Sequence, residues 1–142
     1  VPHIPFEALD ENYVIDREAY LSYFRKMHHL FPKCKKMVMA VRNQIASSHH
    51  TLSGLLYDAV EDQLYTTRIY DIEPIVDPMG VGDAFVAAYI HAHQKWGDKN
   101  QYCLDFSLSA SAIKNTIPGD QNLVSEEEII SNMTSSGGRI QR

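Results

Sequence analysis

The residues best able to do chemistry lie in one short stretch, DPMGVGDAF, at residues 77–85. It follows the apolar run at residues 74–76 and opens a segment whose apolar residues recur at helical spacing. Gly80 and Gly82 let the backbone turn tightly and approach a ligand closely. The amides of a first helical turn lack acceptors within the helix, so they favour a bound anion. With the Asp83 carboxylate at the same point, the stretch has the groups needed to transfer a phosphoryl group to a hydroxyl.

The stretch resembles the D-T-x-G-A-G-D-x-F signature of the ribokinase-like (PfkB) carbohydrate kinases, with Pro78 in place of threonine and Val81 in place of alanine. The resemblance implies that Asp83 is the catalytic base, which accepts the proton of the sugar hydroxyl that attacks the phosphate. It also implies that the amides of Gly80, Val81 and Gly82, with that of Asp83, form an anion hole for the transferred group.

The resemblance also implies a role for Asp77 and the identity of the bound nucleotide and metal ion. Asp77 opens the motif, and in the family the matching aspartate supports the loop or a monovalent cation such as K⁺ beneath it. The proline at position 78 removes one N–H, which the loop can spare only if that group pointed away from the ligand. ATP is the implied phosphoryl donor, and Mg²⁺ is implied because the charge of the phosphates must be neutralised.

Other phosphate-binding motifs fit the sequence less well. A dinucleotide-binding fingerprint would place its third glycine at Phe85, and no strand opens the chain ahead of it. The sequence contains no G-x-x-x-x-G-K-[ST], so a Walker A loop is absent. A plain glycine turn that leads into a helix remains the structural alternative, with Asp83 favouring the positive end of that helix.

A second stretch, residues 109–120, is a candidate for nucleotide contact. Its small residues, Ser111 among them, would let a flat ligand lie close to a helix, and in the resembling family adenine lies against such a helix. The ending T-I-P-G-D, which includes Gly119, and residues 138–142 are similar to the 2-keto-3-deoxygluconate kinases of the family. Tight helix packing through Ala and Ser, followed by a Pro-Gly stop, explains the same residues without a ligand.

The polar segment at residues 42–50 is predicted to be a loop that follows a strand, and its length also resembles the 2-keto-3-deoxygluconate kinases. Arg42 could pair with a phosphate there, because a guanidinium matches phosphate geometry. A solvated surface loop is an equally good explanation. The seven histidines show no His-x-x-x-His spacing, so we predict surface or packing roles for them and no metal site.

Composition bounds the class of protein. The chain has 142 residues, of which 44% are hydrophobic and 22% charged, as expected for one globular domain. Its net charge of −5 argues against a nucleic-acid partner. No apolar run approaches the roughly 20 residues that span a membrane. The two cysteines, Cys34 and Cys103, are far apart and unpatterned, which is typical of reduced thiols in a cytoplasmic protein.

The elements needed to position the signature can be placed from periodicity and capping signals. Asp16 is a predicted N-cap, and Ser125 with Glu128 predicts a capping box. A strand-rich first half followed by helices predicts an α/β fold, and with the resemblance it indicates the C-terminal portion of the three-layer ribokinase-like fold. Helices are predicted over 17–31, 82–96, 100–115 and 125–134, and strands over 36–42, 53–58, 63–70 and 72–76.

The resemblance implies one domain over residues 1–142, the nucleotide-binding part of a sugar kinase whose N-terminal half, with lid and sugar pocket, is absent. We therefore expect ATP-dependent phosphorylation of a sugar or sugar acid, with 2-keto-3-deoxygluconate converted to its 6-phosphate as the first candidate. Fructose, ribose or a nucleoside are alternative substrates, and a non-catalytic nucleotide- or anion-binding domain is an alternative class. The full-length protein could form a homodimer, and the part alone is expected to be inactive and to expose a sheet edge.

Overall fold

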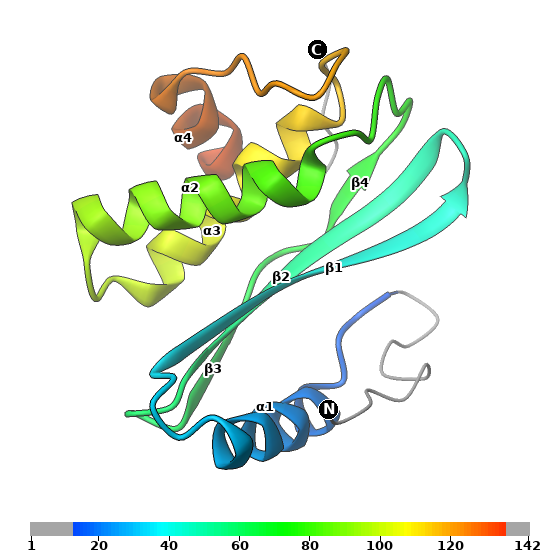
Figure 1. Cartoon of the computed structure of the whole chain (residues 1–142). Helices are drawn as coiled ribbons and strands as arrows, with labels where there is room; N and C mark the ends of the chain where they lie inside the picture. Colours follow the sequence, from blue (N-terminus) through cyan, green and yellow to red (C-terminus); the bar gives the residue numbers. More distant parts are fainter. Residues whose placement is uncertain (1–12, 136–142) are drawn as a thin grey trace.

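The computed structural model describes residues 13–135, which form three layers (Figure 1). A four-stranded sheet lies in the middle, helix α1 covers one face, and helices α2, α3 and α4 cover the other. The α/β prediction is confirmed, whereas residues 138–142 lie outside the described part. The elements in chain order are α1 (Arg17–Leu30), β1 (Lys36–Ala46), β2 (His49–Asp58), β3 (Gln63–Thr66), β4 (Tyr70–Ile72), α2 (Val81–Trp96), α3 (Asn100–Lys114) and α4 (Glu126–Thr134).

Strand β2 is the centre of the sheet, and all its pairings are antiparallel. Strand β1 runs along one side of β2, and β3 and β4 share the other side. Leu52 and Leu56 of β2 belong to the core formed with α2 and α3, whereas Leu55 and Tyr57 pack with α1. Because successive side chains point to opposite faces of a strand, these two cores together bury both faces of β2.

The predicted helix ends are confirmed where local capping groups define them. Asp16 accepts a hydrogen bond from the Ala19 amide at the start of α1, and Ser125 and Glu128 form the capping box that starts α4. Helix α2 ends at Gly97, as predicted from the glycine. In the part of the chain that the structure describes, no helix has both the length and the apolar character needed to cross a bilayer.

The predicted loop at residues 42–50 is wrong. Strand β1 continues to Ala46 and β2 begins at His49, so only a tight turn separates the two strands. The register places Arg42 opposite Leu52, with an irregularity between Gln44 and Ala46. Strand β2 is buried almost throughout, so its backbone groups need partners, and β1 supplies them whatever its side chains are.

The predicted strands at 63–70 and 72–76 are also wrong in their bounds, because β3 ends at Thr66 and β4 covers Tyr70–Ile72. Within residues 13–135 no strand follows Ile72, and Pro74 has no N–H for a ladder. The next amides bond elsewhere: Ile75 donates to the Ser48 carbonyl and Val76 to the Asn115 carbonyl, both at 2.8 Å. The chain therefore leaves the sheet early and crosses to the end of α3, which brings the signature next to the segment after that helix.

Candidate functional site

The signature forms the loop that connects β4 to α2, and the C-terminal end of α3 anchors it. The amides of Val76 and Asp77 both donate to the Asn115 carbonyl, at 2.8 and 3.2 Å. Asn115 is buried, and its side-chain amide donates to the Ser111 carbonyl at 3.1 Å. The end of α3 therefore holds the loop through its backbone at residues 76–77, which precede the two glycines.

Asp77 joins two loops through its carboxylate. One oxygen accepts from the Met79 amide at 2.9 Å, and the other accepts from the Gly119 amide at 2.8 Å. These two hydrogen bonds lower the pKa of Asp77, and the positive charge of Lys114 adds to the effect. Asp77 thus stays ionised and holds residues 77–80 against the turn that follows α3.

Gly80 occupies the N-cap position of α2 in the left-handed region, with φ of 77°. A Cβ at this position would lie 2.4 Å from the Asp120 carbonyl oxygen. Both the backbone conformation and the close approach of the second loop therefore require glycine here.

The first turn of α2 presents amides and a carboxylate together. The Ala84 amide is already used by the Gly80 carbonyl at 2.9 Å, and the Val81 amide makes a long contact of 3.5 Å with the Pro78 carbonyl. Gly82 and Asp83 follow, both exposed, at positions where a helix offers no acceptor for its amides. No side chain caps this end of the helix.

This arrangement can bind an anion through backbone amides while a carboxylate in the same turn stays in contact with solvent. The positive end of the helix dipole favours the same anion. The predicted roles stay predictions for Gly80, Val81, Gly82 and Asp83. In this geometry the amides of Gly82 and Asp83 are the donors for which the helix itself offers no acceptor.

Ser111 lies fully buried in α3, and its hydroxyl donates to the Val81 carbonyl at 2.9 Å. It fastens α3 to the first turn of α2. Because the hydroxyl is used inside the protein, this placement does not support the direct nucleotide contact predicted for Ser111.

Gly119 and Arg42 differ in their relation to the signature. Gly119 is exposed, with φ of 82°, and its amide is taken by Asp77. Arg42 is exposed on β1, and within residues 13–135 no hydrogen bond or ion pair joins it to the signature loop. The structure therefore brings Gly119 into the site and leaves Arg42 outside its hydrogen-bonded framework.

Sequence reasoning missed Lys114 and Asn115, which close the site from beneath. Both are buried, and both bond to backbone carbonyls or amides of the neighbouring loops. A polar pair at the end of a helix of small and apolar residues was the available signal, because such a pair has to find partners when the helix is buried.

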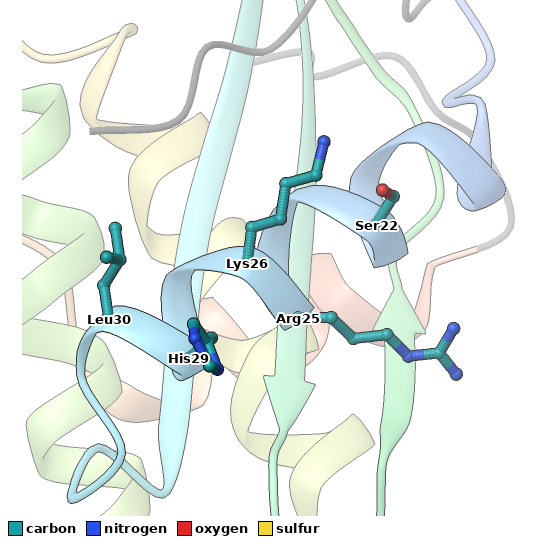
Figure 2. A pocket seen from close by; sticks show the side chains of 5 residues that line it. All are labelled: Ser22, Arg25, Lys26, His29 and Leu30. Carbon is teal, nitrogen blue, oxygen red and sulfur yellow. The ribbon is translucent and has the colours of Figure 1, made fainter.

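A hollow of about 480 Å³ lies over α1, away from the signature (Figure 2). Its lining consists of side chains from this single helix, and Figure 2 shows Arg25 and Lys26 pointing in different directions. Arg25 is paired with Asp62. Without convergent polar groups, this hollow does not compete with the signature as a functional site. It is lined by Ser22, Arg25, Lys26, His29 and Leu30.

Solved structures with a similar fold are carbohydrate kinases. No protein-family model matches the chain, and no curated protein matches it in sequence. The chain is similar to 2-dehydro-3-deoxygluconokinase from Thermotoga maritima, with a TM-score of 0.78 and 29% identity, over 84% of this chain and 35% of that one. It is similar to a PfkB family carbohydrate kinase from Listeria grayi, with a TM-score of 0.75 and 30% identity, over 80% of this chain and 34% of that one.

A third similar structure is a candidate 2-keto-3-deoxygluconate kinase from Enterococcus faecalis, with a TM-score of 0.69 over 94% of this chain and 37% of that one. At 16% identity it supports the fold alone. The chain spans about a third of the length of these proteins. It has the fold of part of a ribokinase-like carbohydrate kinase, which agrees with the resemblance of its signature.

Proposed function

We propose that this chain is the phosphoryl-binding part of a carbohydrate kinase that transfers the γ-phosphoryl group of ATP to a hydroxyl of a sugar or sugar acid. The observation that carries the proposal is the first turn of α2, where the exposed residues Gly82 and Asp83 bring backbone amides without helical acceptors and the Asp83 carboxylate together. The similarity to solved carbohydrate kinases supports the same class of reaction.

In the proposed reaction, Asp83 takes the proton of the substrate hydroxyl as its oxygen attacks the γ-phosphorus. A bond forms between that oxygen and phosphorus, and the bond to the bridging oxygen breaks to release ADP. The amides of the α2 turn donate to the phosphoryl oxygens, where negative charge must be stabilised. Gly80 and Asp77 keep those amides in place, because they fix the loop against the turn at residues 117–120.

Mg²⁺ bound to ATP would neutralise the charge of the phosphates. In the described residues, no group of three or more His, Cys, Asp or Glu side chains is arranged to hold a metal ion. We therefore assign no side chain of this chain as a ligand, and the ion would reach the site on the nucleotide.

The proposed substrate is 2-keto-3-deoxygluconate, phosphorylated to its 6-phosphate. Its support is the similarity to the Thermotoga maritima kinase and the T-I-P-G-D ending of the segment after α3. Fructose, ribose and nucleosides remain alternatives, because the proposed sugar pocket belongs to a part of the kinase that these residues do not include.

A non-catalytic nucleotide- or anion-binding domain is the second candidate. The first turn of α2 supports this candidate as well, because no side chain caps its amides and anion binding needs only those amides. Such a domain would use the same amides but would not need the Asp83 carboxylate, so substitution of that residue separates the two functions.

The test is Asp83→Asn in a complete kinase, made by joining this chain to the preceding segment of the Thermotoga maritima enzyme. We expect turnover to fall about 10²–10⁴-fold while ATP affinity stays nearly unchanged, because the amides remain and the base is lost. Kinase rate and ATP affinity are measured on the same preparations.

Glu127→Gln is the matched control, since Glu127 is also an exposed acid in the first turn of a helix. It should leave both quantities unchanged. Equal turnover in Asp83→Asn and the parent would contradict a catalytic role for Asp83 and favour the binding domain.

A further inference from the structure

Lys114 is a buried charged residue that the proposed reaction does not use. It is the last residue of α3, and its exposed fraction is 0%. Within residues 13–135 it is the only lysine or arginine in the buried class. A charged group removed from water is costly unless oxygen atoms or an opposite charge replace the lost hydration. The partners of its ammonium group therefore indicate why the residue is there.

Those partners are backbone carbonyls of the two loops that build the site. Lys114 Nζ donates to the Ile117 carbonyl at 2.9 Å and contacts the Asp77 carbonyl at 3.5 Å. The first carbonyl belongs to the turn after α3, and the second opens the signature. The ammonium is thus a compact cation, held by carbonyl oxygens, that links the two loops.

A separate monovalent cation beneath the loop has a poor ligand set here. K⁺ sites in proteins are built from carbonyl and similar oxygens that replace the hydration shell of the ion. The carbonyl of Asp77 already faces the Lys114 ammonium, and both carboxylate oxygens of Asp77 accept backbone amides, from Met79 and Gly119. These residues fit a fixed ammonium group better than they fit an exchangeable ion.

We propose that the ammonium of Lys114 takes the place of a bound monovalent cation and holds the phosphate-binding loop in position without added K⁺. Lys114 is a positioning residue in this scheme, because it acts through the backbone of Asp77 and does not touch the substrate. The proposal rests on the proposed function for its effect on nucleotide binding. Its effect on loop stability does not depend on that function.

The test compares chloride salts of K⁺, NH₄⁺ and tetramethylammonium at equal ionic strength. Thermal unfolding is measured for the parent chain, Lys114→Met and Lys114→Ala. The affinity for ATP is measured for the same three chains joined to the preceding segment of the Thermotoga maritima kinase. Met keeps the length of the side chain without its charge, and Ala opens space that a small cation could fill. Lys33→Ala is the control for loss of one positive charge, because Lys33 is exposed in the turn between α1 and β1.

We expect the parent and Lys33→Ala to show the same midpoint and affinity in all three salts. Lys114→Met should bind ATP about ten- to a hundredfold more weakly, because the loop amides are displaced. Lys114→Ala should have a lower unfolding midpoint and a weaker affinity for ATP in tetramethylammonium, and both should recover in K⁺ or NH₄⁺. A variant that is unfolded in tetramethylammonium but regains its native circular dichroism in K⁺ supports the proposal in the same way.

Three results would overturn the proposal. The first is a parent chain whose midpoint rises in K⁺, which would indicate a separate cation site. The second is a Lys114→Met variant with unchanged midpoint and affinity. The third is a Lys114→Ala variant whose unfolding midpoint and ATP affinity are not restored by K⁺ or NH₄⁺. If the parent joined to that segment does not bind ATP in any salt, the proposed function fails, while the thermal measurements still decide the role of Lys114.

Discussion

At the scale of single residues, the two glycines of the signature have different physical roles. Gly80 has a positive φ of 77°, and a Cβ there would collide with the backbone of Asp120. Gly82 has no positive φ, and a Cβ there would meet no protein atom within 4 Å. The fold therefore requires the first glycine, whereas the second keeps open the space in which we propose that the phosphate lies.

This difference predicts opposite effects of two alanine substitutions. Gly80→Ala should lower the free energy of unfolding by about 1–3 kcal/mol, because it forces a strained backbone and a backbone contact. Gly82→Ala should leave stability unchanged or raise it by up to about 1 kcal/mol, since alanine favours helix. It should nevertheless weaken ATP binding. Urea denaturation and calorimetry of each variant measure the two effects, and loss of stability in Gly82→Ala alone would contradict the assignment.

At the scale of elements, an exposed ionic cluster fastens α1 to the hairpin of β2 and β3. Arg25 donates two hydrogen bonds to the carboxylate of Asp62, at 3.1 and 2.8 Å, and the Tyr57 hydroxyl donates to the same carboxylate at 2.6 Å. These hydrogen bonds lower the pKa of Asp62 to about 2. Together with the packing of Phe24 on Tyr57, they fix the helix on its face of the sheet.

The depressed pKa predicts a pH dependence of stability. The pKa of Asp62 is lower in the folded chain than in the unfolded one, so its contribution is present above about pH 4 and is lost as the pH falls toward 2. Asp62→Asn should therefore unfold at a lower temperature than the parent at pH 7, with a gap that narrows between pH 4 and 2. Asn tolerates the positive φ of this position, so the comparison isolates the charge.

Arg25→Met provides the second arm of this measurement. It removes the partner of Asp62 and should show a gap with the same pH profile, measured by thermal unfolding followed by circular dichroism. A gap that stays constant down to pH 2 in both variants would show that the carboxylate charge does not hold α1 in place.

At the scale of the whole molecule, the chain corresponds in fold to one part of a larger carbohydrate kinase. It spans about a third of the length of the similar solved structures. Within the described residues, β1 pairs with β2 on one side and with no strand on the other. An open strand edge of this kind is a place where further strands can add. In the proposed kinase, the sugar pocket and lid come from the segment that adds to this part.

The 142-residue chain alone should therefore bind ATP weakly, on the order of millimolar, because the closing surface is absent and binding must still offset lost translational freedom. It should phosphorylate no sugar acid. Addition of the preceding segment of the Thermotoga maritima kinase should restore both affinity and activity. Calorimetry on the chain with and without that segment measures the difference, and micromolar binding that the segment does not improve would favour an independent binding domain.

Features that depend on near neighbours in the chain were predictable from the amino-acid sequence. Three helix ends are local in this sense, because each hydrogen bond or backbone conformation involves residues only a few positions apart. They are the N-cap at Asp16, the capping box of Ser125 and Glu128, and the C-terminal end of α2 at Gly97. The signature was recognisable for the same reason, since its glycines and carboxylate lie within a single turn.

Features that depend on partners distant in the chain became visible only in the folded structure. Strand β1 extends to Ala46 because buried β2 needs backbone partners, although the side chains there are polar. Ser111 and Lys114 lie inside because α3 is covered by α2 and the sheet, so their polar atoms bond to Val81 and Asp77, which are far away in sequence. Gly80 is indispensable because Asp120 approaches it from another loop. Burial and close approach arise only when separate segments pack together, and for that reason composition and spacing could not reveal them.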